Sequence, residues 1–468
     1  MNTIKQITNE IESVEGVKLL NVDPGKATNR TVVTFVGSPE EVIDAAFLAI
    51  KKASELIDMS KHSGEHPRMG ATDVCPLVPI ANIEMDEVVT YAHKLGERVG
   101  KELGIPGYFY EYAASTEERR NLAVVRKGEY EALKAKLVDP QWQPDFGPAE
   151  FVKAKHTGAT AISARDFLIA YNVNLNTTST RRANAVAYDI REKGRIKRVG
   201  EVLSGDIVKD ADGNTLWTPG KLKHVKAIGW YIEEYGVTQV TMNITNITET
   251  PLHLAFDETA KAANARGIRA TGSELVGLVP KSAMLEAGKY FLRKQNRSTG
   301  IHESELIKIA IKSMGLDELG PFIPEERIIE YMLESGTDKK LVDLSLTDFA
   351  NETASESPAP GGGSISAYAG ALGISLATMV ANLSAHKRGW DERWEEFSDW
   401  ADQGQILKDE LLFLVDEDTN SFNKIMEAMR LPKGTDAEKK ARKEAMDAAT
   451  KYAILTPFRV MKASLKSM

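Results

Sequence analysis

Two histidines stand four residues apart in the segment MSKHSGEHPRMGATDVCP, residues 59–76. Histidines at i and i+4 on a helix could bind one zinc ion together. Gly64 lies between them and Pro67 follows the second, and both disfavour the helix that such a site needs. His66, next to Pro67 and Arg68, could instead exchange a proton near neutral pH. A turn whose histidines bond only to backbone explains the same residues, so acid–base chemistry and a structural turn both stay open.

A basic loop is the second candidate. The segment DFGPAEFVKAKHTGATAISARDF, residues 145–167, places Lys153, Lys155, His156 and Arg165 among glycines. Such a loop could bind carboxylates through its cations and backbone N–H groups. A solvated loop with the same charges is the alternative.

Two segments near the C-terminal end could also take part in chemistry. SPAPGGGSISAYAG, residues 357–370, is a glycine-rich turn that enters a helix, with Ser364 as the expected cap. It lacks the lysine of a phosphate-binding loop, but its glycines could let an anionic ligand approach the helix. LVDEDTNSF, residues 414–422, carries three adjacent acids ending in Asp418. An inward carboxylate would have a raised pKa and could donate a proton, whereas an exposed acidic patch would not.

The composition limits the classes of function. The 468 residues carry 59 Lys and Arg against 67 Asp and Glu, a net charge of -8, which argues against nonspecific nucleic-acid binding. The single cysteine, Cys75, has apolar neighbours and is expected to be buried and structural in a reducing cytoplasm. The apolar stretch 364–385 is diluted by serine, glycine and alanine, so we expect a buried helix and no membrane span.

Strands and helices alternate over the first two thirds of the chain, as in α/β domains. The first unit is predicted to open with strands at 16–23 and 30–37, a turn at Pro24 and Gly25 between them, and a helix capped by Ser38. It continues with a helix near 84–103, a strand at 107–113 and one long buried strand at 164–175. The second unit is predicted to contain a helix at 180–193, a hairpin at 224–246, a helix near 251–265, a strand at 268–280 and two further helices.

From residue 341 onward the pattern is helical only, with helices predicted at 364–384, 390–430 and 436–465. We therefore predict an α/β plus all-α protein. Its two α/β units, with mixed sheets and helices, span 1–168 and 169–332, a linker spans 333–340, and a helical domain spans 341–468.

Segments along nearly the whole chain resemble a known enzyme family. LLNVDPGKATNRTVVTFVG, LIDMSKHSGEHPRMGATDVCPLVP, DFGPAEF, FLIAYNVNL and AIGWY resemble glutamate formiminotransferase. SPAPGGGSISA, LVDEDTNSF and EAMRLPKGT resemble the cyclodeaminase domain usually fused to it. The resemblance implies transfer of the formimino group from N-formimino-L-glutamate to polyglutamylated tetrahydrofolate, which yields 5-formiminotetrahydrofolate and L-glutamate in histidine degradation. It implies a second reaction to 5,10-methenyltetrahydrofolate and ammonia, and no metal.

The resemblance also assigns roles to residues. His66 takes the acid–base role of the transferase, with His62 as structural support, and Asp418 is the acid of the cyclodeaminase. The folate-contacting stretch maps to Gly147 through Gly158, and ligand contacts are expected at Pro148, Phe151, Lys153, Lys155 and the turn Gly361, Gly362 and Gly363.

Two further assignments follow from the chemistry of the implied reaction. Arg68, with Lys153 and Lys155, suits the carboxylates of both substrates. A carboxylate near the amidine intermediate is expected, and Asp23 is our candidate.

The sequence departs from the family at both ends. A first strand with a CVPNFSEG-like motif and the later cyclodeaminase helices are not found, so we expect the second activity to be lost or impaired and the helical region to self-associate. The resemblance implies a cytoplasmic homo-oligomer built from dimers. A catalytically degenerate folate-binding or assembly subunit is the alternative, and a transferase with a formyl donor is a third possibility.

Overall fold

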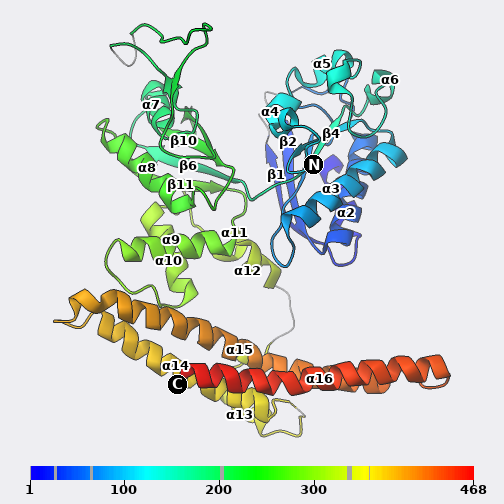
Figure 1. Cartoon of the computed structure of the whole chain (residues 1–468), viewed down its shortest axis with the longest axis vertical. Helices are drawn as coiled ribbons and strands as arrows, with labels where there is room; N and C mark the ends of the chain where they lie inside the picture. The colour runs from blue at the N-terminus through cyan, green and yellow to red at the C-terminus, as the bar shows by residue number, and fades with distance from the viewer. Residues whose placement is uncertain (1, 26–28, 64–66, 201–204, 335–339, 358) are drawn as a thin grey trace. The chain divides into compact units, whose positions relative to one another are not determined.

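The computed structural model describes residues 2–25, 29–63, 67–200, 205–334, 340–357 and 359–468. The chain divides into two compact units (Figure 1). The first contains Met1–Pro280 with Leu316–Leu333, and the second contains Lys281–Gly315 with Glu334–Met468. Helices therefore dominate the C-terminal part and mixed helix and sheet the N-terminal part, as predicted.

The N-terminal part of the first unit is built around a parallel sheet of order β3-β5-β4, formed by Val74–Leu77, Thr160–Ala164 and Gly107–Glu111. A helix α1 (Asn2–Glu12) and an antiparallel ribbon of β1 (Lys18–Gly25) and β2 (Arg30–Val36) precede it. Its long helices are α2 (Pro39–Leu56) and α3 (Met85–Arg98), and α3 continues as the π-helix Val99–Leu103.

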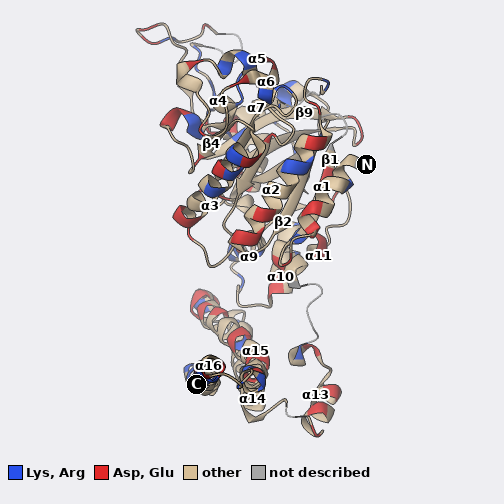
Figure 2. Ribbon diagram, turned by 90° about the vertical axis from the view of Figure 1, so that its right-hand side faces the viewer, with Lys and Arg blue, Asp and Glu red and all other residues tan. Residues whose placement is uncertain are grey.

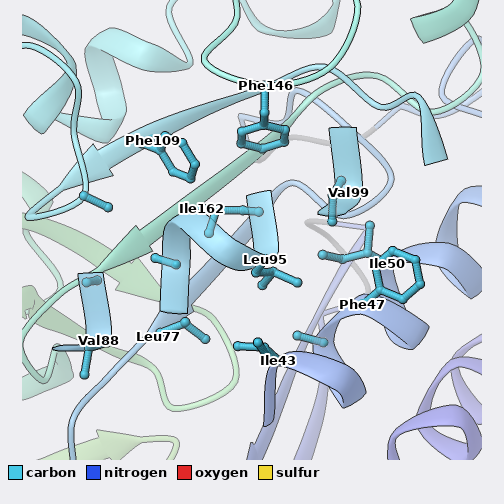
Figure 3. Close-up of a cluster of buried hydrophobic side chains, with 14 of the residues drawn as sticks. Ile43, Phe47, Ile50, Leu77, Val88, Leu95, Val99, Phe109, Phe146 and Ile162 are labelled. Atoms are coloured by element: carbon cyan, nitrogen blue, oxygen red, sulfur yellow. The ribbon is translucent and has the colours of Figure 1, made fainter. Parts of the chain in front are cut away.

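Two apolar clusters cover the two sets of side chains that alternate along the parallel sheet. One joins Ile43, Phe47 and Ile50 of α2, at helical spacing, to Leu95 of α3 and Ile162 of β5 (Figure 3). Each such side chain stabilises the fold by roughly 1.5–3 kcal/mol when fully buried. The other cluster joins β4 and β5 to the short helices α4 (Leu122–Val125), α5 (Glu129–Lys136) and α6 (Phe151–Ala154). The loops beside this second cluster carry the candidate transferase site.

The second sheet is antiparallel, with the order β11-β6-β10-β9. Its strands are Ala270–Val276, Ile169–Leu175, Val237–Ile244 and Val225–Ile232. Helices α7 (Thr180–Ile190) and α8 (Leu252–Asn264) pack on it, and β7 (Arg195–Ile196) pairs with β8 (Trp217–Thr218) as a separate ribbon. The unit ends with α11 (Pro324–Arg327) and α12 (Ile329–Glu334). Figure 2 shows basic and acidic residues interspersed along the ribbon of helices such as α3.

The second unit is helical: α9 (Lys281–Arg293), α10 (Glu303–Met314), α13 (Leu346–Thr353), α14 (Gly362–Ala385), α15 (Trp394–Arg430) and α16 (Asp436–Ser467). Among the described residues, α14 alone is long and apolar enough to cross a membrane, with a mean hydropathy of 1.5. One face of α14 packs against α15 and α16 around Ala367, Ala371 and Leu411. Only 33% of the most apolar window of α14 is buried, and Leu376 and Leu383 are 62% and 67% exposed, so the prediction of a buried helix holds for one face and is wrong for the rest.

Three local predictions are wrong, and a fourth, Ser38 as the cap of α2, is right in position only. The single strand predicted at 164–175 is two strands in different sheets, β5 and β6, because residues 165–168 leave the first sheet before the second begins. Pro24 and Gly25 are not a turn but pair in β1, where an edge ribbon tolerates a proline. Ser38 occupies the N-cap of α2 without a side-chain cap bond. Ser364 lies inside α14, whose N-cap is Gly361.

Candidate active sites

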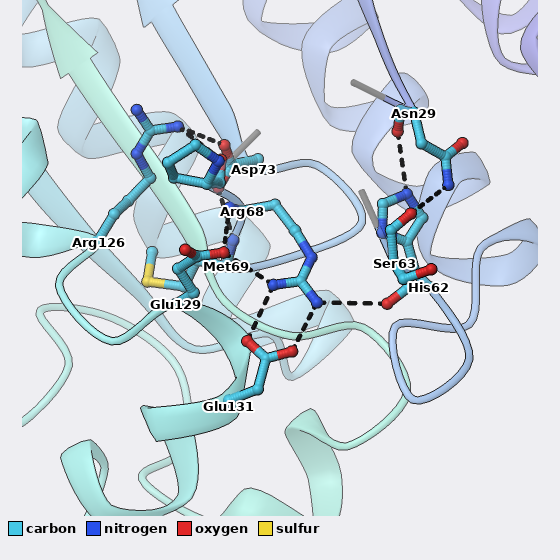
Figure 4. A network of polar contacts seen from close by, with 10 residues as sticks. Asn29, His62, Ser63, Arg68, Met69, Asp73, Arg126, Glu129 and Glu131 are labelled. Atoms are coloured by element: carbon cyan, nitrogen blue, oxygen red, sulfur yellow. Dashed lines mark hydrogen bonds and ion pairs between the residues drawn. The ribbon is translucent and has the colours of Figure 1, made fainter. Parts of the chain in front are cut away.

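The loop after α2 holds His62, the first histidine of the motif, against Asn29, which directly precedes β2. His62 Nε2 lies 3.0 Å from Asn29 O, and Asn29 Nδ2 donates to Ser63 O at 2.7 Å (Figure 4). A carbonyl only accepts, so Nε2 carries the proton in this bond. His62 Nδ1 is buried without a hydrogen-bond partner among the described residues. The ring is thus engaged at one nitrogen and enclosed at the other.

Residues 64–66 lie outside the described residues, and the role of His66 therefore stays a prediction. The structure does describe both flanks of the motif. On the C-terminal flank, Arg126 NH1 donates to Pro67 O at 3.2 Å and to Asp73 Oδ2 at 2.7 Å. Asp73 Oδ1 accepts the Met69 N–H at 2.8 Å. A carboxylate and a guanidinium therefore close the turn that follows the motif.

Arg68 forms its ion pairs and hydrogen bonds with residues of this chain. Its guanidinium lies 2.9 Å from Glu129 Oε2 and 2.6 Å from Glu131 Oε1, and NH2 also donates to His62 O at 3.3 Å (Figure 4). Its side chain is only 13% exposed. Arg68 lowers the pKa of Glu131 by hydrogen bonding. Two carboxylates of α5 face this one guanidinium. The local charge is therefore not the positive one that we had expected for a site that binds a substrate carboxylate.

The histidine motif and the predicted folate stretch lie side by side. Ala71 N donates to Thr157 O at 2.8 Å, and Ala159 N donates to Met69 O at 3.0 Å. Gly158 has a φ of +70°, and a Cβ there would come within 2.2 Å of Met69 O. Glycine is therefore needed both for the backbone conformation and for the close approach. Two segments separated by some ninety positions in the sequence form one surface.

A buried ion pair anchors the start of the folate stretch. Arg119 NH1 lies 2.6 Å from Asp145 Oδ1, and both side chains are 9% exposed. Asp145 Oδ2 accepts the Phe109 N–H of β4 at 2.8 Å. Gly147 follows with a φ of +75°, and a Cβ on it would come within 2.2 Å of Ile105 O. The start of the folate stretch is therefore held beside the first residues of β4.

The other residues predicted for the transferase site make few polar contacts. Phe151 begins α6 and packs 6.2 Å from the ring of Tyr130. Lys153 pairs with Glu150 at 3.1 Å on the surface, and Lys155 is exposed with no ion pair among the described residues. Pro148 lies in the turn before α6. Asp23 is exposed in β1 opposite Val32, and no side-chain bond to it occurs within the described ranges.

Cys75 lies in β3 and burial raises the pKa of its thiol to about 12. It is therefore a protonated thiol at neutral pH, as expected for a structural cysteine.

In the helical unit, the glycine-rich turn meets the predicted acid. Asp418 Oδ2 accepts the Ser364 N–H at 3.0 Å, so the carboxylate of α15 caps the first turn of α14. A Cβ on Gly363 would come within 2.1 Å of Asp418 Oδ1. A Cβ on Gly362 would meet no described atom within 4 Å, so only Gly363 of the two glycines is required by this contact.

The neighbouring acids of α15 have other environments. Asp416 Oδ1 accepts the Leu341 N–H at 2.6 Å, and burial raises the pKa of Asp416. Glu417 is 9% exposed. Asp418 itself is only half-buried. The acid with the raised pKa thus holds the connector before α13, whereas Asp418 alone faces the glycine turn.

Comparisons with known proteins cover almost the entire chain. Family models described as the formiminotransferase domain, N-terminal subdomain, the formiminotransferase domain, and formiminotransferase-cyclodeaminase match residues 1–165, 170–334 and 345–468. Formimidoyltransferase-cyclodeaminase from Gallus gallus is 45% identical over 97% of this chain and 80% of that protein. The chain belongs to the formimidoyltransferase-cyclodeaminase family.

Some of the relatives are named for both activities and others for the transferase alone. Formimidoyltransferase-cyclodeaminase from Mus musculus is 41% identical over 98% of this chain and 80% of that protein. Glutamate formimidoyltransferase from Thermoplasma acidophilum is 39% identical over 66% of this chain and 93% of that protein. A solved formiminotetrahydrofolate cyclodeaminase from Thermotoga maritima matches 26% of this chain and 56% of its own at 28% identity, with a TM-score of 0.22. That score is too low to establish a common arrangement of helices.

Sequence reasoning missed the ion pairs that hold the transferase loops. Arg119, Arg126 and Asp73 were not singled out, because their partners lie far away in the sequence. Asp73 and Asp145 lie within segments quoted for other residues, and nothing in the sequence indicates which arginine each one meets.

Proposed function

We propose that this protein transfers the formimino group from N-formimino-L-glutamate to tetrahydrofolate, giving 5-formiminotetrahydrofolate and L-glutamate. The observation that carries the proposal is the backbone pairing of the histidine motif with the predicted folate stretch, through Ala71 with Thr157 and Ala159 with Met69. Family membership supplies the reaction, and this pairing supplies a surface on which donor and acceptor can meet. Tetrahydrofolate is the co-substrate.

His66 is the proposed acid and base of the transfer. The folate amine attacks the formimino carbon, and His66 takes the proton that the amine loses. The bond between that carbon and the glutamate nitrogen then breaks, and the same histidine returns the proton to the departing nitrogen. One histidine is enough because the proton released in the first step is consumed in the second.

Arg68 and Asp73 position the motif in this proposal. The Arg68 guanidinium donates to His62 O on one side of the motif. On the other side, Arg126 donates to Pro67 O and Asp73 accepts the Met69 N–H. Arg68 is thereby a positioning residue rather than the ligand of a substrate carboxylate. Of the two candidate lysines, Lys155 is the better ligand for a carboxylate, because Lys153 already pairs with Glu150.

The test is a coupled absorbance assay with formiminoglutamate and tetrahydrofolate, with added cyclodeaminase to convert the product. His66→Ala should abolish transfer, whereas His62→Ala should weaken it, and both should keep the melting temperature of the parent within a few degrees. Full activity of His66→Ala would contradict the assignment of the histidine. No transfer by the parent protein would favour the degenerate folate-binding subunit, and transfer only from N-formylglutamate would favour the formyl donor.

A second function is supported by the helical unit. The contact between Gly363 and Asp418 joins the two segments that the cyclodeaminase reaction requires. Asp418 is the proposed acid that protonates the nitrogen leaving as ammonia while the folate ring closes. Ammonia release from supplied 5-formiminotetrahydrofolate measures this reaction. Asp418→Asn should remove the release that the parent shows, and unchanged release would exclude Asp418 as the acid.

The proposal includes the predicted domain limits, a cytoplasmic location and assembly from dimers. The single cysteine supports a reducing compartment. Exposed apolar side chains on α14 support assembly, since Leu376 is 62% exposed, Val380 57% and Leu383 67%. Light scattering on the parent and on Leu376→Glu would test assembly, because a charge on an interface should lower the molar mass.

A further inference from the structure

The chain passes between its two compact units three times. It leaves the first unit after Pro280, returns at Leu316 and leaves again after Leu333. The excursion between the first two crossings carries α9 and α10 and lies within residues 170–334, which match the formiminotransferase domain. It packs nevertheless in one unit with residues 345–468, which match formiminotransferase-cyclodeaminase. A segment of the transferase domain is therefore built into the helical unit.

The loop that joins α9 to α10 is polar and yet buried. Ser298 and Thr299 are only 3% and 2% exposed. Ser298 Oγ donates to Asn382 Oδ1 of α14 at 2.6 Å. The Thr299 N–H donates to Ser398 Oγ of α15 at 3.0 Å, and Thr299 Oγ1 donates to Asp402 Oδ2 at 2.7 Å. Loops generally lie on the protein surface, and the buried polar groups of this one are satisfied by the helices of the cyclodeaminase match.

Gly300 brings the main chain of the loop directly onto α15. A Cβ on it would come within 2.2 Å of Ala401 Cβ and 2.4 Å of Ala401 C. Gly300 O accepts the Asn382 Nδ2 amide at 2.7 Å and the Gln405 Nε2 amide at 3.0 Å. Glycine is needed here for the close approach of two backbones.

An ion pair extends the contact from the loop to α9. Lys289 Nζ lies 3.2 Å from Asp402 Oδ1, with side chains 27% and 20% exposed. The Asp402 carboxylate thus uses one oxygen for α9 and the other for the loop. Matched hydrogen bonds, an ion pair and close packing are the features of a specific interface.

This contact lies far from the candidate cyclodeaminase site on the same helices. Gly363 is at the start of α14, and Asn382 is near its end. At a rise of 1.5 Å per residue, the two positions are about 28 Å apart along the helix. Substitutions in the loop therefore leave the glycine turn and Asp418 untouched.

We propose that the loop between α9 and α10 is a docking surface whose partner is the helix pair α14 and α15 of the same chain. It holds the transferase and cyclodeaminase portions together without help from the linker 333–340. Docking of this kind requires neither reaction, so its test is independent of the proposed function.

The test cuts the linker of the folded full chain. A specific protease site introduced within residues 333–340 divides the purified protein into two fragments, and size-exclusion chromatography shows whether they elute together. The parent fragments should co-elute. The fragments of Gly300→Ala should separate, because the new Cβ would collide with Ala401. Gly320→Ala, in the loop after α10, is the matched control and should behave as the parent, since its Cβ would meet nothing within 4 Å.

Thr299→Val is a milder second variant. It keeps the volume of the side chain but removes the hydroxyl that donates to the Asp402 carboxylate. A lost charge-assisted hydrogen bond should raise the dissociation constant of the cut fragments roughly 10- to 150-fold. Thr353→Val is its control, because the Thr353 hydroxyl is exposed and bonds to Phe349 O within α13. The circular dichroism spectrum before cleavage shows whether each variant folds.

The outcomes are distinct. Separation of the parent fragments overturns the docking surface, because the linker alone would then join the two portions. Fragments of Gly300→Ala and Thr299→Val that bind as tightly as those of their controls overturn it as well, because another surface would hold them. Weakened binding confined to the two loop variants supports it, and Thr299→Val decides if Gly300→Ala does not fold.

Discussion

The buried pair of Arg119 and Asp145 determines how firmly the folate stretch is held. The two charged atoms are 2.6 Å apart with both side chains 9% exposed. The second guanidinium nitrogen donates to two main-chain carbonyls at 3.0 and 2.9 Å. The guanidinium also lies 5.5 Å from the centre of the Trp142 ring. Arg119→Met removes all of the polar contacts while it keeps an apolar side chain of similar length.

The magnitude follows from what the substitution leaves behind. Asp145 would remain buried with only the Phe109 N–H as a donor, and loss of one partner of a buried ion pair costs about 3–5 kcal/mol. Each of the two carbonyls adds about 1 kcal/mol unless water replaces the donor. With water at both carbonyls only the loss of the ion pair remains, and we then expect the free energy of unfolding of the first unit to fall by about 4 kcal/mol. The folate stretch would lose its anchor, so the KM for tetrahydrofolate should also rise.

The assay is urea denaturation of the full chain, followed by tryptophan fluorescence, with steady-state kinetics on the same samples. Arg120→Met is the matched control, because Arg120 is 47% exposed, pairs with Glu117 at 3.5 Å and lies 5.7 Å from the centre of the Tyr112 ring, with no buried charge among these partners. Such a surface pair contributes about 0–1 kcal/mol. The double variant Arg119→Met/Asp145→Asn should recover part of the loss, since no buried charge remains. If Arg119→Met costs no more than Arg120→Met, the pair does not anchor this segment.

Three further predictions concern single positions. Gly158→Ala should abolish transfer, because its Cβ would come within 2.2 Å of a carbonyl oxygen of the histidine loop. Gly104→Ala is the control: this residue also has a positive φ, but its Cβ would meet nothing within 4 Å, so only stability should fall. Gly363→Ala should lower the melting temperature and any cyclodeaminase rate, because its Cβ would come within 2.1 Å of the Asp418 carboxylate. Gly362→Ala should change neither, and equal effects of the two variants would contradict the contact. Burial lowers the pKa of Lys136 from 10.5 to about 8, so the unfolded chain binds more protons between these values and stability should rise as pH increases from 8 to 10.5. Lys136→Met should remove that slope in denaturation curves, and an unchanged slope would show that another group titrates.

The sequence predicted an element correctly where its apolar residues repeat with a single period and form one buried face. The apolar spacing in α2 and the two-residue period of β9 gave their positions within a few residues, because the pattern reflects one buried face. The segment 164–175 failed for the opposite reason. β5 is buried at every position and β6 at every position but Ala170, so no change of period marks the four residues at which the chain passes from one sheet to the other.

The candidate sites were predictable as segments but not as contacts. The glycine turn and Asp418 were both identified, and the structure adds that they touch. Arg68 was assigned to a substrate, yet its carboxylate partners stand 61 and 63 residues further along the chain. An isolated arginine next to a motif gives no sign of such partners. Pairings of this kind depend on the folded arrangement of α5 and the loop, which local chemistry does not encode.

The choice between the two histidines can now be argued from contacts as well as resemblance. A residue that takes and returns a proton needs one nitrogen free to face the substrate. His62 Nε2 bonds to Asn29 O, and its Nδ1 is buried with no hydrogen-bond partner among the described residues. His62 would have to break its bond to Asn29 before Nε2 could reach a ligand. If the motif performs the proton transfer, the work therefore falls to His66, and His62→Ala should affect it only through the position of the loop.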